Sequence, residues 1–159
     1  MTSRRTGSGG RLVAIVAIVA AVASLSACGP FSHDPDSDLA VWDVGSQQQL
    51  SPGSTGFTAI VERTGCTGGE QGTPEKPVIE VGPSTITITF RLGPHIASGT
   101  CQGTEGVPYR VRLPEPIGSR TLVDGACAPG GDLGSTGFCL RDGVRLSWRH
   151  GAPRLFGVP

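Results

Sequence analysis

The sequence has few of the residues from which catalytic sites and large cores are built. It contains five Phe, two Trp, one Tyr and three His in 159 residues. It has no G-x-S-x-G, no phosphate-binding G-x-G-x-x-G or P-loop, and no C-x-x-C pair. The chain therefore lacks the signatures of α/β-hydrolases, nucleotide-binding enzymes and zinc ribbons. So few aromatic residues predict a small core that needs covalent reinforcement.

The N-terminus has the layout of an export signal. Arg4, Arg5 and Arg11 precede an apolar run from Leu12 to Leu25. That run is shorter than the roughly 20 residues that span a bilayer, so we expect a cleaved signal peptide over 1–27 and not a permanent membrane span.

The next residues, Leu25-Ser26-Ala27-Cys28-Gly29, resemble the lipobox of bacterial prolipoproteins. The resemblance implies cleavage after Ala27 and a diacylglycerol thioether on Cys28. Two or three acyl chains would anchor the protein durably, since each buried methylene contributes about 0.8 kcal/mol. The alternative is an ordinary signal peptide with Cys28 as a leftover thiol. We expect a lipid-anchored protein on the extracytoplasmic face of the cell membrane, with residues 28–38 as a tether and 39–159 as one domain.

The charge balance argues against a nucleic-acid partner. Once residues 1–27 are removed, ten basic side chains face thirteen acidic ones, which leaves a net charge near −3. The expected partners are the membrane and an envelope protein or glycan.

Four cysteines remain after Cys28, and an even number in an exported protein predicts two disulfides. Three connectivities are possible. We favour Cys66–Cys101 and Cys127–Cys139, because each pair flanks what look like neighbouring strands. A four-cysteine metal site is the weaker alternative, and we expect neither a metal nor a cofactor.

Period-two alternation of apolar and polar residues recurs along the mature chain, and no segment of eleven or more residues has helical periodicity. Because such alternation is typical of half-buried strands, we expect an all-β fold. The fold class is a small disulfide-braced antiparallel sandwich or partly open barrel. About seven short strands are predicted: 39–44, 57–62, 77–81, 85–91, 108–113, 121–123 and 144–149.

Two of these strands and one turn carry specific expectations. In 144–149, Val144, Leu146 and Trp148 should face inward and Arg145 outward, because the residues alternate. Asp142-Gly143 is a strong signal for a hairpin turn that would join a strand at 138–140 to this one. In 85–91, an outward row of Thr and Arg, with Arg110 and Arg112 beside it, offers a polar ligand-binding face. The favoured interpretation of that row is an ordinary solvated surface.

Catalytic candidates are few. His95 lies in a loop near Cys101, and with Asp124 or Asp132 it offers the alternative of an envelope hydrolase assembled from distant residues. A small-ligand carrier with an internal cavity is a third hypothesis. The prediction we favour is a non-catalytic binding or structural envelope domain.

Residues 57–127 are similar to a recurring module of uncharacterised secreted and membrane-anchored actinobacterial proteins. The resemblance rests on Cys66-Thr67-Gly68-Gly69, on 85–90, on 99–103, on Pro108-Tyr109 and on the run Leu113-Pro114-Glu115-Pro116-Ile117-Gly118-Ser119-Arg120-Thr121-Leu122-Val123-Asp124-Gly125. It implies no activity or ligand. In that run we expect the two prolines to end a strand, and Gly118 and then Asp124-Gly125 to turn the chain. Arg120 and Asp124 could pair across that turn, and the alternative is that they do not touch.

Overall fold

The computed structural model describes residues 38–65, 68–94, 105–129 and 133–157, which belong to one compact unit. They form eight strands and two short 3-10 segments, and no described helix is long and apolar enough to cross a bilayer. In chain order the elements are β1 (Asp38–Val44), β2 (Gly56–Arg63), β3 (Val78–Val81), β4 (Thr85–Leu92), β5 (Val107–Arg112), β6 (Thr121–Asp124), η1 (Gly125–Cys127), η2 (Gly137–Gly143), β7 (Val144–Arg149) and β8 (Ala152–Leu155).

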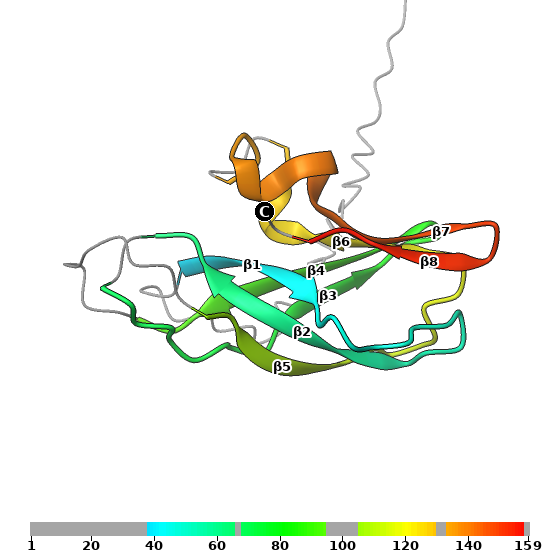
Figure 1. Ribbon diagram of the computed structural model, residues 1–159, viewed down its shortest axis with the longest axis horizontal. Helices are drawn as coiled ribbons and strands as arrows, with labels where there is room; N and C mark the ends of the chain where they lie inside the picture. Colours follow the sequence, from blue (N-terminus) through cyan, green and yellow to red (C-terminus); the bar gives the residue numbers. More distant parts are fainter. Residues whose placement is uncertain (1–37, 66–67, 95–104, 130–132, 158–159) are drawn as a thin grey trace, which may run out of the picture. The chain divides into compact units, whose positions relative to one another are not determined.

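The expected all-β class is confirmed, and the strands share one central member, β4. One side of the fold runs β5-β2-β1-β4, and the other runs β4-β6-β7-β8, with β3 also paired to β4. Every pairing is antiparallel except that of β4 with β6. Figure 1 shows β7 and β8 lying across the β1–β2 layer. This arrangement fits a sandwich or partly open barrel.

The alternation seen in the sequence accounts for the core. In β4, Ile86, Ile88 and Phe90 are fully buried on one face. Trp42 packs against Phe57, with ring centroids 5.5 Å apart, and against the edge of Phe90 at 6.3 Å. Aromatic pairs in this geometry stabilise a fold by more than the area that they bury. The aromatic residues in this part of the core therefore contribute strongly although the chain has few of them.

β4 changes partner along its length. Its C-terminal residues Phe90–Leu92 pair with β1, whereas Thr85–Ile88 pair with β6. The second half of β1 is therefore separated from β4. The Trp42 indole Nε1 donates to the carbonyl of Ile88 at 2.9 Å, which bridges part of this separation.

The run 113–120 is hydrogen-bonded to the connection between β1 and β2. The backbone N–H groups of Leu113, Ile117 and Gly118 donate to Thr55, Ser54 and Pro52. Of the two alternatives for Arg120 and Asp124, the structure shows the second: Arg120 donates to Glu115 and to the carbonyls of Ile117 and Pro116, and Asp124 pairs with Arg145.

The predicted hairpin at Asp142-Gly143 is wrong. Arg141, Asp142 and Gly143 have φ values of 57°, 55° and 73°, and they end η2 instead of joining two strands. A Cβ on Gly143 would lie 2.5 Å from the Cβ of Cys127, so only glycine fits there. The hairpin lies one strand later, where His150 and Gly151, both with positive φ, join β7 to the unpredicted strand β8.

A disulfide links η1 to η2. The Cys127 and Cys139 sulfurs lie 2.10 Å apart, the pairing favoured from the sequence. Cys66 and Cys101, the other expected pair, lie outside the described residues.

Candidate functional site

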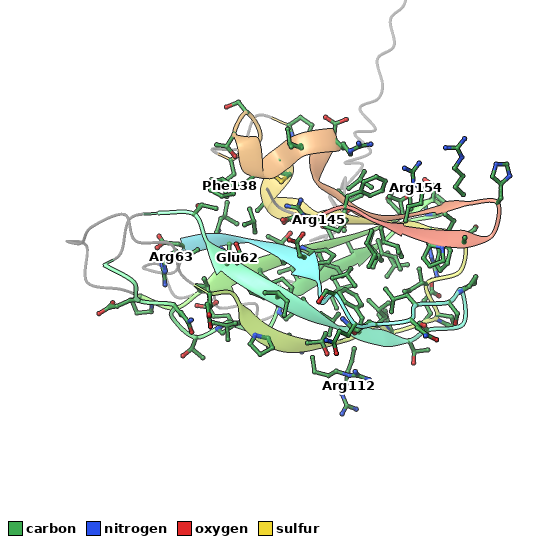
Figure 2. All side chains as sticks on the ribbon, viewed as in Figure 1. Glu62, Arg63, Arg112, Phe138, Arg145 and Arg154 are labelled. Carbon is green, nitrogen blue, oxygen red and sulfur yellow. A yellow bond between two sulfur atoms is a disulfide. The ribbon has the colours of Figure 1, made fainter. Side chains whose placement is uncertain are left out.

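Arg145 is the residue whose position departs most from the sequence pattern. Alternation places it outward on β7, yet its residue is 1% exposed. It lies between the strands β1 and β2 and the overlying η1–η2 segment (Figure 2). At Arg145 the outward face of β7 is therefore covered by the molecule's own chain, whereas on the same face Ser147 is half-buried and Arg149 is exposed.

Asp124 is the partner of Arg145 and is fully buried at the end of β6. Its Oδ2 accepts from Arg145 Nη2 at 2.8 Å and from the backbone N–H of Trp42 at 3.1 Å. Its Oδ1 accepts from the N–H of Ala126 at 3.0 Å and so caps η1. The carboxylate thus supplies an acceptor to β1 where β4 no longer does.

The Arg145 guanidinium reaches three more groups. Its Nη2 donates to the Phe138 carbonyl at 3.1 Å and lies 3.8 Å from the Cys127 sulfur, and its Nε lies 3.9 Å from Asp43 Oδ1. One side chain from β7 therefore contacts η1, η2 and β1.

Burial and hydrogen bonding act in opposite directions on the carboxyl groups here. Burial raises the pKa of Asp124, and the hydrogen bond and charge of Arg145 and the backbone donors of Ala126 and Trp42 lower it in part. Burial also raises the pKa of Glu62 on β2; the Asp43 carboxylate raises it further, and Arg145 lowers it. Asp43, Glu62, Asp124 and Arg145 form a buried charge cluster, the name used below.

The contacts of the buried charge cluster hold β1, η1 and η2 to the strands β6 and β7. The Asp124 carboxylate is surrounded by donors from its own chain and has no exposed surface. A general base must reach a substrate proton directly or through one water. Among the described residues no group of three or more His, Cys, Asp or Glu side chains is placed to hold a metal.

The other sequence candidates separate into two groups. Ala27, Cys28, His95, Asp132, Cys66 and Cys101 lie outside the described residues. In the Thr row of β4, Thr89 is half-buried, and a Cβ on Gly125 of η1 would lie 1.9 Å from its Oγ1. Because β1 and β2 separate β4 from β5, this row and Arg110 belong to different strands of the sheet and do not adjoin.

Arg110 and Arg112 instead line a groove with β3, called here the β3–β5 groove. Its volume is about 270 Å³, and it is lined by Lys76, Pro77, Ile79, Tyr109, Arg110 and Arg112. Ile79 and Tyr109 pack against the core, and the Tyr109 ring meets the Phe90 ring edge to face at 5.2 Å. The groove thus has an apolar base.

Among the described residues, three cations and no carboxylate line the β3–β5 groove. Lys76, Arg110 and Arg112 are exposed, and none of them pairs with a described residue. Figure 2 shows Arg112 directed away from the sheet. Sequence reasoning placed Arg110 and Arg112 outward but missed Lys76, whose only signal is that it is the single lysine of the chain.

A second groove of about 320 Å³ lies beside β8. It is lined by Asp43, Val44, Ser46, Leu155, Phe156 and Gly157. The guanidinium groups of Arg141 and Arg154 stack over Phe156 at 4.8 and 5.7 Å. The Phe156 ring is therefore already in contact with cations of the same chain. This makes the second groove a weaker candidate for a ligand site than the β3–β5 groove.

Removing Arg145 should leave Asp124 as a buried, uncompensated charge. We expect Arg145→Met to lower the free energy of unfolding by about 3–5 kcal/mol, measured by urea denaturation. Arg149→Met, an exposed change on the same strand, should cost less than about 0.5 kcal/mol. Adding Asp124→Asn to Arg145→Met should restore part of the loss, and equal costs for Arg145→Met and Arg149→Met would contradict this role.

The raised pKa of Glu62 predicts a pH dependence. Between its unfolded and folded pKa values the folded state binds more protons, so the free energy of unfolding falls as the pH rises through that interval. In urea melts at a series of pH values, Glu62→Gln should remove the part of this fall that Glu62 causes, so its stability relative to the wild type should rise as the pH rises through that interval; Asp124 keeps its own contribution. The exposed Glu80→Gln should keep the wild-type fall; a Glu62→Gln difference independent of pH would refute the prediction.

Comparison of the chain with protein-family models, with curated proteins and with solved structures finds no match. Any function must therefore be argued from the arrangement of these side chains.

Proposed function

We propose that this protein is a lipid-anchored extracytoplasmic binding protein, attached to the cell membrane through Cys28, whose β domain holds an anionic envelope component in the β3–β5 groove. The observation that carries the proposal is the combination of an apolar base, formed by Ile79 and Tyr109, with three cations that pair with none of the described residues. Ligand sites in proteins commonly join an apolar pocket to a few convergent polar groups.

Burial of the charge cluster supports binding over catalysis. Burial raises the pKa of Glu62 and of Asp124. Asp124 is enclosed by its own donors, which argues against the hydrolase built on His95 and Asp124. The groove cations, by contrast, are exposed to solvent and pair with no residue that the structure describes.

The carrier hypothesis is compatible with the same groove. A ligand would lie between the free edges of β3 and β5, not inside the core, since the core side chains are packed against one another. In this proposal the site is a surface groove, and it accepts a small ligand or a narrow part of a larger one.

The lipid anchor predicts a specific mass. Native protein extracted from membranes should begin at Cys28 and carry two or three acyl chains, and its mass should show no alkylation of the other four cysteines before reduction. Intact-mass analysis before and after reduction and alkylation measures both properties. A Cys28→Ser variant should lack the lipid mass, whereas an unmodified Cys28 in the native protein would contradict the anchor.

If the β3–β5 groove binds anions, their binding should be saturable and should be detected at Tyr109. Tyr109 is the only tyrosine, so the lipidated protein labelled with 3-fluorotyrosine and held in phosphatidylcholine nanodiscs gives one ¹⁹F resonance. A panel of small phosphates, carboxylates, acidic peptides and acidic glycan fragments should include members that shift it saturably. Choline and spermidine should not shift it. Failure of every anion in the panel would exclude the proposed function.

A further inference from the structure

The β3–β5 groove lies between two strand edges that no described strand covers. On β5, the Leu113 N–H donates to Thr55 on the β2 side. Because backbone direction alternates along a strand, Pro108, Arg110 and Arg112 direct their backbone groups to the free edge. On β3, Gly82 donates to Thr85 of β4, so Ile79 and the preceding Pro77 face the free edge by the same alternation.

Both free edges therefore carry a proline that has no N–H to offer. Prolines and charged side chains at an edge are the features by which sheets resist addition of another strand. A peptide that paired with these edges would meet Pro77 on one side and Pro108 on the other. An extended peptide is consequently a poor occupant, and a small ligand held by side chains is a better one.

The charges define the chemistry of that ligand. Three cations line the groove without a carboxylate to balance them. A phosphate monoester carries about −1.5 to −2 charges near pH 7 and three acceptor oxygens, and arginine forks bind such oxygens in pairs. A carboxylate brings one charge and two oxygens. The apolar base formed by Ile79 and Tyr109 favours a ligand with an apolar group beside its phosphate.

The groove does not have the properties of a site for an anionic membrane surface. Polybasic segments that bind such surfaces contain about four to eight clustered cations, and this groove has three in a chain whose mature part is acidic overall. Its volume of about 270 Å³ lies at the small end of ligand pockets, which suits a small molecule.

We propose that the β3–β5 groove binds a soluble phosphate monoester that carries a short apolar group, with Arg110, Arg112 and Lys76 holding the phosphate and Ile79 and Tyr109 contacting the apolar part. This inference rests on the proposed function and specifies its ligand class.

The test uses the same fluorotyrosine-labelled protein in phosphatidylcholine nanodiscs, titrated with hexyl phosphate, inorganic phosphate and hexanoate. Hexyl phosphate should shift the Tyr109 resonance saturably and bind about tenfold more tightly than either of the others. Arg110→Gln with Arg112→Gln should weaken it by about tenfold or more. The matched double change Arg149→Gln with Arg154→Gln removes two charges elsewhere and should leave the affinity unchanged.

The outcomes separate the two proposals. If hexanoate or an acidic peptide binds as tightly as hexyl phosphate, the phosphate inference is overturned and the anion-binding function stands. The inference is also overturned if the groove variant binds hexyl phosphate like the wild type, or if only phosphatidic acid added to the nanodiscs shifts Tyr109. A urea-denaturation midpoint of the unliganded groove variant equal to that of the wild type shows that its fold is intact.

Discussion

The ion pair between Asp124 and Arg145 is the interaction on which the rest of this structure depends. It lies where β4 exchanges β1 for β6, and its two side chains contact β1, η1 and η2 as well as their own strands. Two charges removed from water are costly unless their hydrogen-bonding positions are filled. Here the backbone of Trp42 and Ala126 and the carbonyl of Phe138 fill several of them. The pair thereby selects one arrangement of the segments that cover the sheet.

The Cys127–Cys139 disulfide acts on the same region. It joins η1, which Asp124 caps, to η2, which Arg145 contacts. Both segments are short and contain few buried apolar side chains. A covalent link and a buried ion pair therefore perform there the role that a larger apolar core performs in bigger domains.

Charge is distributed in two contrasting ways across the described residues. In the buried charge cluster, Asp124 and Arg145 are hydrogen-bonded to one another and to the backbone away from solvent, and they hold the covering segments to the sheet. In the β3–β5 groove, cations stand at the rim of an apolar base without carboxylates beside them. A polar group that is already paired offers little to a ligand, whereas an unpaired cation beside an apolar surface offers both charge and contact area.

The sequence by itself determined the β class, most strand positions and the inward faces of β4 and β5. Period-two alternation reveals these features because successive side chains of any strand point to opposite faces of its sheet. It also identified Cys127–Cys139 as a plausible pair. It did not determine the burial of Arg145, the partner of Arg120 or the position of the β7–β8 hairpin. Alternation tells which side chains share a face, but whether that face meets solvent depends on which distant segment covers it. Only the tertiary structure brought η1 and η2 over Arg145, and only it brought Lys76 beside Arg110 and Arg112, residues more than thirty positions apart in the chain.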